Sequence, residues 1–203
     1  MDDLTVKLTE RTARKNRKRN ERKREIAASA MEALKQLGYA NTTLRDIAAK
    51  SDLSLGMLHY YFEDKIELIT YCVENYKAEF IHDLSLSIEH AKDRDELVAS
   101  FSEALVASII DDEAIHRLWY DIRTQAMFDP LFRPVVARIE KSLIGLVNAA
   151  VMKAGTDAGG RIDILYAMLD GVFRFVMQSQ VTGRAMTRKQ MQQLFRELLD
   201  QFL

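Results

Sequence analysis

The 203-residue sequence contains one cysteine, two prolines and eight glycines. A single cysteine excludes an internal disulfide, and so few helix-breaking residues in a chain that is 48 % hydrophobic favour a packed helical core. No apolar run approaches the ~18 residues of a membrane span, and the N-terminus lacks the apolar core of a signal peptide. We therefore expect a cytoplasmic protein with no membrane association.

Histidine and cysteine are also scarce, and the sequence contains no recognisable motif for metal binding or catalysis. The four histidines, His59, His82, His90 and His116, are scattered along the chain. None of them forms a pair with glutamate at the spacing of a metal site that also has a third ligand. There is no glycine-rich phosphate loop and no nucleophile elbow. Cys72 falls on the apolar face of a predicted helix, which favours a small core residue over a reactive thiolate. The sequence therefore predicts no metal, no cofactor and no enzymatic activity.

The charges are distributed unevenly along the chain. Residues 1–65 carry 14 Lys and Arg against 10 Asp and Glu, whereas residues 66–203 carry 15 against 20. The formal net charge of -1 hides this difference. A basic front and an acidic rear are typical of a protein that meets DNA with one end only.

The stretch from Thr42 to Lys65 predicts two short helices joined by a turn of about three residues. The apolar residues between Leu44 and Ala48 share one helix face, and Thr43 stands before them as an N-cap with Asp46 three residues on. Ser54 can cap the second helix, in which apolar residues are interleaved with histidine and tyrosine. This pattern predicts a helix-turn-helix, whose second helix enters the DNA major groove.

The run from Thr42 through Leu68 contains T-T-x-R-D-I-A in the first helix, S-x-G-x-L-x-Y-Y-F in the second and D-K-x-E-L at the next helix start. It resembles the DNA-binding domain of TetR/AcrR-family transcriptional regulators. The resemblance implies that Thr43 and Lys65 contact phosphates, that Leu55, Gly56, Met57 and Tyr60 approach bases, and that His59 and Tyr61 touch the DNA backbone. Arg45 and Ser54 complete the candidate set. The alternative is a surface helix whose aromatic residues pack on a neighbour.

Three positions depart from the pattern that is usual in this family. Asp52 stands where the turn commonly has glycine, Leu55 where a basic residue is frequent, and His59 where tyrosine is usual. Aspartate tolerates the left-handed turn conformation, so we expect the fold to be kept. Without a cation at Leu55, the operator sequence cannot be deduced from the helix.

We expect three segments: a basic N-terminal arm over residues 1–24, the helix-turn-helix domain over 25–70, and a ligand-binding and dimerisation domain over 71–203. The arm is either an unstructured tail that follows phosphates or a solvated helical extension. A first helix from Ile26 to Leu37 should end at Gly38. From Asp64 onward the spacing predicts only helices, so the fold class is all-α.

The last two predicted helices indicate a homodimer. Residues 160–180 carry two apolar rows, one from Ile162 to Val176 and one of Ile164, Met168 and Phe175, and a helix with two apolar faces needs two partners. Residues 187–202 begin with a capping box and carry one apolar stripe. Pairing these two helices with their symmetry mates gives a four-helix interface, which is also similar to TetR-family proteins.

The middle helices contain residue types that line small-molecule pockets, although such residues are also typical of simple core. The segment WYDIRTQAMFDPLFRP resembles the regulatory region of the choline-sensing BetI-type members of the family, and choline recognition uses an aromatic cage to which Trp119 and Tyr120 can contribute. The candidate ligand-binding residues are Tyr76, Phe80, His116, Trp119, Tyr120, Arg123, Met127, Phe128, Tyr166, Phe173 and Met177.

The sequence thus predicts a homodimeric transcriptional repressor that binds a palindromic double-stranded DNA operator and is released by a small-molecule inducer. The alternative is a DNA-binding regulator without a small-molecule ligand, controlled by a protein partner or acting as an architectural protein. A cavity behind Trp119 would favour the first hypothesis, and a solid core there would favour the second.

Overall fold

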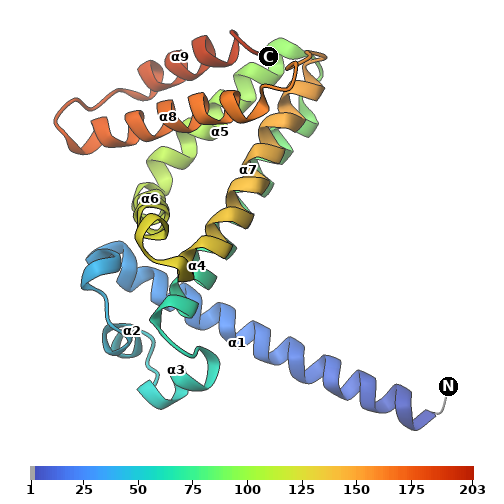
Figure 1. Cartoon of the computed structure of the whole chain (residues 1–203), viewed down its shortest axis with the longest axis vertical. Coiled ribbons are helices and arrows are strands. Elements are labelled where there is room, and N and C mark those ends of the chain that lie inside the picture. The colour runs from blue at the N-terminus through green and yellow to red at the C-terminus, as the bar shows by residue number, and fades with distance from the viewer. Residues whose placement is uncertain (1–2) are drawn as a thin grey trace. The chain divides into compact units, whose positions relative to one another are not determined.

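The computed structural model describes the backbone of residues 3–203 and the side chains of residues 11–203. Over these residues the chain forms only helices, as the sequence predicts (Figure 1). Every helix in this described part is too short or too polar to cross a membrane. The elements are α1 Asp3–Asn41, α2 Leu44–Lys50, α3 Leu55–Tyr61, α4 Lys65–His90, α5 Arg94–Asp111, α6 Glu113–Phe128, the 3₁₀ helix η1 Pro130–Phe132, α7 Arg133–Lys153, α8 Ile162–Val181 and α9 Arg188–Leu199.

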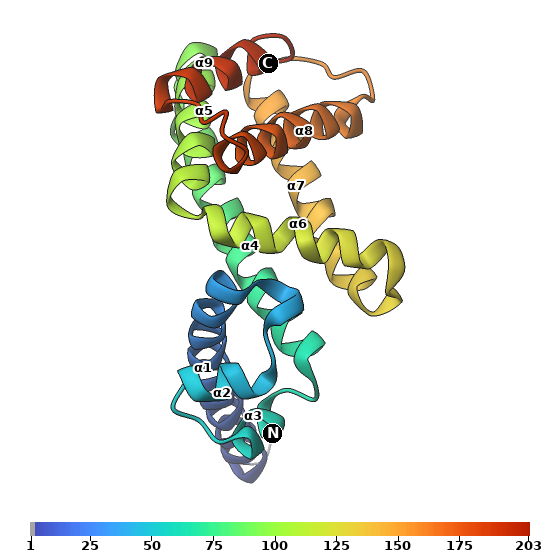
Figure 2. The same cartoon turned by 90° about the vertical axis from the view of Figure 1, so that its left-hand side faces the viewer.

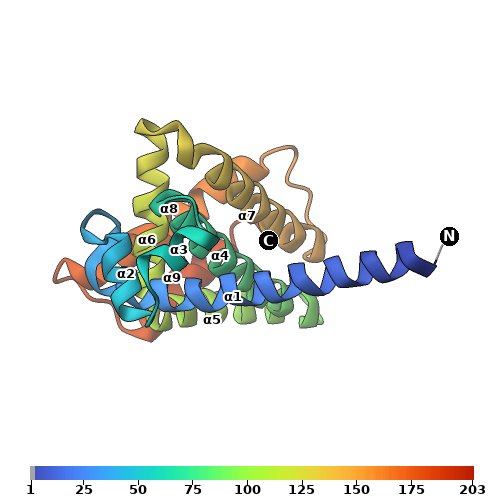
Figure 3. The same cartoon turned by 90° about the horizontal axis from the view of Figure 1, so that it is seen from below.

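The chain divides into two compact units, Met1–Val73 and Glu74–Leu203, and the boundary falls inside α4. In the first unit, α1 begins at Asp3 rather than near Ile26. Its N-terminal part consists largely of Lys, Arg and Glu, which are good helix formers, and it projects well beyond α2 and α3 (Figure 3). The predicted stop at Gly38 is confirmed: this residue leaves the helical region with φ 71°, and the kink there separates the main part of α1 from a last short turn that ends at Asn41.

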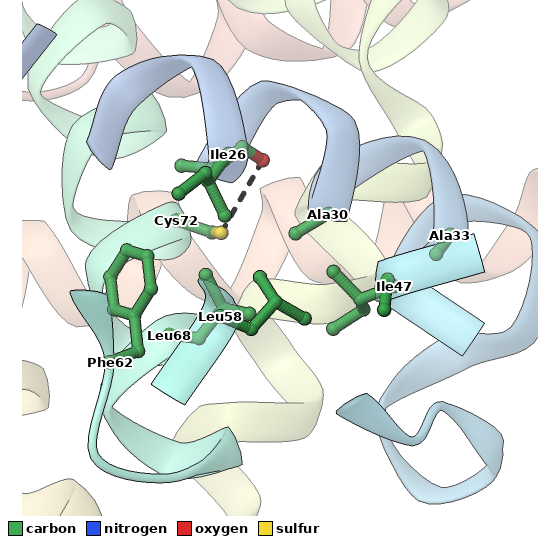
Figure 4. Packing of buried hydrophobic residues seen from close by; sticks show 10 residues of the cluster. Ile26, Ala30, Ala33, Ile47, Leu58, Phe62, Leu68 and Cys72 are labelled. Atoms are coloured by element: carbon green, nitrogen blue, oxygen red, sulfur yellow. Dashed lines mark hydrogen bonds between the residues drawn. The ribbon is translucent and has the colours of Figure 1, made fainter. Parts of the chain in front are cut away.

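A small apolar core holds the first unit together (Figure 4). Ile26 from α1, Ile47 from α2, Leu58 from α3 and Phe62 after it are all buried. Cys72 also lies in this core, with its Sγ 3.5 Å from the carbonyl oxygen of Ala27. Burial raises the pKa of the Cys72 thiol to about 12, so the residue is a packing group rather than a nucleophile.

The second unit is built from the rest of α4 and from α5 to α9. Helix α5 packs along α9, and α7 packs on both α6 and α8 (Figure 2). Both prolines of the chain, Pro130 and Pro134, lie where the chain enters α7. A short turn precedes the helix: the Asp129 carboxylate accepts a hydrogen bond from the Leu131 N–H at 2.9 Å, Pro130 begins η1, and α7 follows from Arg133.

Helices α8 and α9 use their apolar residues differently. Helix α8 keeps an exposed row at one-turn spacing, formed by Ile164, Met168, Gly171 and Phe175, opposite its buried row. The predicted capping box of α9 is present at Thr187 and Gln190. In contrast to the exposed row of α8, the apolar stripe of α9 is buried inside its own unit. It consists of Met191, Phe195, Leu198 and Leu199.

Candidate functional site

The helix-turn-helix is assembled by the caps that its sequence predicts. The Thr43 hydroxyl accepts from the Asp46 N–H at 3.2 Å, and the Asp46 carboxylate accepts from the Thr43 N–H at 2.8 Å, which fixes the start of α2. Asp52 takes the left-handed turn conformation with φ 51°. Ser54 then caps α3 by accepting from the Met57 N–H at 3.2 Å. The turn therefore forms without the glycine that is usual at position 52.

Helix α3 buries one side chain and exposes most of the others. Leu58 is fully buried, whereas Gly56, Met57, His59 and Tyr60 are exposed, Tyr60 to 64 %. A methyl group added at Gly56 would meet no protein atom within 4 Å. The fold therefore does not require glycine here, although glycine weakens a helix.

The remaining candidates for DNA contact fall into two groups. Thr43, Arg45 and Ser54 are exposed, while Leu55 and Tyr61 are half-buried, and Tyr61 packs against the core of the unit. The ammonium of Lys65 donates to the Tyr39 carbonyl at 2.7 Å and lies 4.3 Å from the centre of the Tyr39 ring. Lys65 and Tyr61 thus already have roles inside the unit.

The basic segment of α1 is exposed from Arg11 to Arg22. Lys23 differs from its neighbours: its Nζ lies 2.9 Å from Glu67 and 4.6 Å from the centre of the Phe62 ring. Lys23 therefore ties α1 to the start of α4, and the residues before it leave a run of cations in solvent.

In the second unit, a cavity of about 40 Å³ lies beside Trp119. That volume holds a few water molecules, well below the roughly 300 Å³ of a typical ligand pocket. Its wall is mainly apolar, with polar groups from Lys77, Tyr120, Tyr166 and Asp170. The apolar lining consists of Phe80, Leu84, Phe101, Leu105, Trp119, Leu143, Leu146, Val147, Leu169 and Phe173.

Lys77 is the most unusual of the polar groups. Only 2 % of the residue is exposed, and its Nζ lies 4.3 Å from the centre of the Phe80 ring and 5.4 Å from that of Trp119. Its Nζ is 3.3 Å from His116 Nδ1. Burial lowers the pKa of Lys77 to about 7, because a charged ammonium is poorly solvated there.

His116 is the buried partner of this lysine. Burial and the neighbouring Lys77 hold its pKa well below the usual value, so the imidazole is neutral. Nδ1 accepts from Lys77, and Nε2, which then carries the proton, lies 3.1 Å from the Tyr76 hydroxyl. His116 therefore orients Lys77 without neutralising it.

The second polar group of the cavity is centred on Asp170 of α8. Its carboxylate accepts from Arg123 at 2.5 Å and from the Tyr120 hydroxyl at 3.0 Å, and Arg123 also pairs with Glu140 of α7 at 2.6 Å. These bonds join α6, α7 and α8. The buried Tyr166 hydroxyl, in contrast, has no hydrogen-bond partner among the described residues.

A wider groove of about 410 Å³ lies between α4, α5 and the start of α6. It is lined by four acidic residues, Glu79, Asp83, Asp111 and Asp112, together with Tyr76. Phe80 and Leu84 line both this groove and the cavity beside Trp119. These two side chains therefore form part of the wall between the two spaces.

Residues 26–72 match the family model described as bacterial regulatory proteins, tetR family. This match identifies residues 26–72 as a DNA-binding domain of the tetR type. No curated protein matches the sequence. A TetR transcription regulator from Haloarcula marismortui has a similar structure, with a TM-score of 0.74, 18 % identity and coverage of 91 % of this chain and 99 % of that one.

Two further solved structures carry ligands. FadR from Bacillus subtilis in complex with stearoyl-CoA has a TM-score of 0.69 and 16 % identity, and the match covers 88 % of this chain and 96 % of the FadR chain. The multidrug binding protein EbrR complexed with imidazole has a TM-score of 0.66 and 21 % identity, with coverages of 87 % and 94 %. At these identities the likeness shows the fold alone, and it extends through both units.

The ligand-site candidates that the sequence suggests do not all lie together. Phe80, Trp119, Tyr120, Tyr166 and Phe173 line the cavity. Tyr76 lines the acidic groove, His116 and Arg123 belong to the hydrogen-bond networks beside the cavity, and Met177 lines a separate hollow. Met127 and Phe128 lie on the surface at the end of α6, with Phe128 exposed to 78 %.

Lys77 and Asp170 line the cavity but are absent from the ligand-binding residues predicted above. A signal for Lys77 was present: it continues the buried row Val73, Phe80 and Leu84 of α4 at helical spacing, where a charged residue is unusual. Asp170 gives no comparable signal. Its role depends on Arg123, 47 residues earlier in the chain.

Proposed function

We propose that this chain is a homodimeric transcriptional repressor, which binds a palindromic operator and leaves it when a small molecule binds the unit Glu74–Leu203. The observation that carries the proposal is the exposed face of α3, held by predicted caps in a domain that matches the TetR family. A second recognition helix, supplied by the partner copy, would occupy the next major groove about 34 Å away.

In this proposal, some of the candidate residues contact base edges and the others contact phosphates. Gly56, Met57 and Tyr60 on the exposed face of α3 approach base edges together with the half-buried Leu55, and Thr43, Arg45, Ser54 and His59 meet phosphates. Tyr61 packs mainly on the core, and Lys65 must share its ammonium between the Tyr39 carbonyl and a phosphate. The exposed cations of α1 add attraction that is independent of sequence.

Gly56→Ala should stabilise the fold and weaken DNA binding. The methyl group meets no protein atom, so better helix propensity should raise the free energy of unfolding by about 0.5–1 kcal/mol. The same methyl group would separate the α3 backbone from the groove wall and reduce operator affinity by roughly tenfold, or about 1.4 kcal/mol. Thermal unfolding and fluorescence anisotropy with labelled operator measure the two effects.

Gly145→Ala is the matched control for this variant. Gly145 is exposed on α7, and a methyl group added there also meets no protein atom within 4 Å. It should stabilise the chain to a similar degree and leave operator affinity unchanged. Equal operator affinity for Gly56→Ala and the parent chain would mean that α3 does not approach DNA at this residue.

The proposed dimer uses the exposed row of α8, because Ile164, Met168 and Phe175 form one apolar face with no covering element in the unit. Gly171 in the same row has open space where a side chain would be, which allows two helices to approach closely. The sequence assigned the apolar stripe of residues 187–202 to the interface as well. Because that stripe is buried against its own unit, α9 would contribute its outer, mainly polar side.

Release by a ligand would act through α4. This helix runs without interruption from Lys65 to His90, so its last part belongs to the cavity and its first part to the DNA-binding unit. A ligand shifts the equilibrium only as far as it prefers the non-binding conformation. Two proteins of similar fold are complexed with stearoyl-CoA and with imidazole, which supports a small-molecule ligand for this chain.

The experiment for the DNA part is selection of bound sequences from a random double-stranded library. The proposal predicts an inverted repeat whose half-site centres lie about one DNA turn, or a multiple of it, apart. Enrichment of a single half-site would contradict the dimeric reading. The absence of any enriched sequence would contradict the repressor function itself.

The small cavity favours a second candidate, a DNA-binding regulator that is controlled by a protein partner and senses no small molecule. The two candidates differ in one observable. A ligand that binds only the folded state raises the melting temperature by mass action, and the second candidate predicts that no metabolite in a broad screen has this effect.

A further inference from the structure

We propose that the cavity beside Trp119 binds the carboxylate of an amphiphilic small molecule, with the Lys77 ammonium and the Tyr166 hydroxyl as hydrogen-bond donors. The inference rests on the proposed function, because this molecule would be the inducer. It goes beyond that function by naming the chemical class of the ligand and two residues that would recognise it.

The first argument is the incomplete bonding of Lys77. A lysine ammonium has three donors, and the described residues provide one hydrogen-bond acceptor, His116 Nδ1 at 3.3 Å. None of the ion pairs among the described residues includes Lys77, although it is only 2 % exposed. A buried ammonium without an anion is strongly unfavourable, so an anion that entered here would bind favourably.

The second argument is the Tyr166 hydroxyl. It is buried, it has no hydrogen-bond partner among the described residues, and its side chain lines the same cavity as Lys77. Buried polar groups in folded proteins normally have partners. A carboxylate offers about four acceptor positions on two oxygens, so one bound carboxylate can accept from both residues.

The other walls indicate what the carboxylate is attached to. Leu105, Leu143, Leu146, Val147 and Leu169 present only hydrocarbon, which suits an alkyl tail. Asp170 also lines the cavity, but its two oxygens already accept from Arg123 and from Tyr120. Its charge is therefore balanced by Arg123 and does not make the cavity anionic.

A cationic ligand fits this cavity poorly. Trp119 and Tyr120, the two residues expected in a choline cage, each already face a cation of the chain itself: Lys77 lies over Trp119 and Arg174 over Tyr120. The Lys77 Nζ also lies over Phe80 and, at 5.7 Å, over Tyr76. A quaternary ammonium would have to displace it or lie beside a like charge in a poorly solvated site.

The present volume of about 40 Å³ limits the ligand to a short chain unless a wall moves. Phe80 and Leu84 separate the cavity from the groove of about 410 Å³, so a rotamer change at Phe80 would join the two spaces. Binding of a long alkyl chain would therefore indicate that this wall opens, and binding of short chains alone would indicate that it stays closed.

The test uses butanoate, hexanoate, octanoate and decanoate, each compared with the alcohol of the same length. Trp119 is the only tryptophan of the chain and lines the cavity, so its fluorescence reports occupancy directly. We expect at least one carboxylate to bind at least tenfold more tightly than its alcohol and to raise the melting temperature. Lys77→Met should abolish this preference, and Tyr166→Phe should weaken carboxylate binding by roughly 3–10-fold.

Lys141→Met is the control, since it removes an exposed lysine from α7 of the same unit and should not change carboxylate affinity. Three outcomes would overturn the assignment: equal affinity for carboxylate and alcohol, a carboxylate preference that survives in Lys77→Met, or no binding by any member of the series. Operator affinity is measured separately. Carboxylate binding without an effect on operator affinity would refute the inducer role and keep the site. Operator release by another class of molecule, with no carboxylate bound, would refute the site and keep the ligand-responsive repressor.

Discussion

Lys77→Met is expected to raise the free energy of unfolding at pH 6 by about 2–4 kcal/mol and to lose this advantage by pH 10. Burial lowers the pKa of Lys77 from 10.5 to about 7, a difference worth about 3–5 kcal/mol. Methionine has a similar length and no charge, and its sulfur packs well beside the rings of Phe80 and Trp119. Loss of the bond to His116 offsets about 1 kcal/mol of the gain.

The pH dependence follows from proton binding. Between pH 7 and 10.5 the unfolded chain keeps the Lys77 proton more firmly than the folded chain does, so stability rises with pH in that interval. Below pH 7 both states are protonated, and the full cost of the buried charge is present. The parent chain should therefore gain stability relative to Lys77→Met as the pH rises from 7 to 10.

The groups that face Lys77 from α4, α6 and α8 do not obscure this signal. His116 stays neutral because its pKa is held well below its ordinary value, and burial raises the pKa of Tyr76 above its ordinary value. Asp170 on α8 is paired with Arg123, while Asp112, at the start of α6, and Asp170 both favour the charged lysine. Denaturant unfolding of both proteins at pH 6, 8 and 10 is the measurement. A constant difference across these values would mean that Lys77 does not titrate in this interval.

Met168→Arg is expected to convert the proposed dimer into a folded monomer and to reduce operator affinity by roughly 100-fold or more, because only one half-site remains bound. Met168 is 42 % exposed in the unit, so the substitution leaves the core intact. In a two-fold interface each substitution appears twice, and two unpaired charges would be buried between the partner helices. Analytical ultracentrifugation gives the oligomeric state, and anisotropy gives the operator affinity.

Met152→Arg is the matched control, since Met152 is also an exposed methionine, at 71 %, but lies on α7. It should remain dimeric and bind operator as the parent chain does. If Met168→Arg sediments as a dimer with normal operator affinity, the exposed row of α8 is not the interface. If both variants become monomers, the interface is wider than this row.

The predictions from the sequence are most accurate for features that depend on neighbouring residues. The cap at Thr43, the turn at Asp52 and the stop at Gly38 each depend on residues within a few positions, so one sequence is enough to identify them. The basic arm shows the limit of that approach. Its charge left open an unstructured tail or a helical extension, and its high helix propensity makes it continuous with α1.

The candidate ligand site was less predictable because it depends on contacts between distant helices. Trp119 and Phe173 are 54 residues apart and line one cavity, whereas Phe128, in the same aromatic segment as Trp119, faces solvent. The stripe of α9 was correctly seen as apolar, but periodicity alone does not distinguish burial against α5 from burial against a second chain.

The most direct test of the account is the affinity of the parent chain for its selected operator, measured with and without the carboxylate that stabilises it most. Anisotropy at fixed salt is suitable, because DNA affinity depends strongly on ionic strength. We predict high affinity without ligand, at least tenfold weaker binding at saturating carboxylate, and no change with the alcohol of equal length. If Trp119 fluorescence reports a fully occupied cavity and operator affinity is unchanged, the carboxylate is not the inducer.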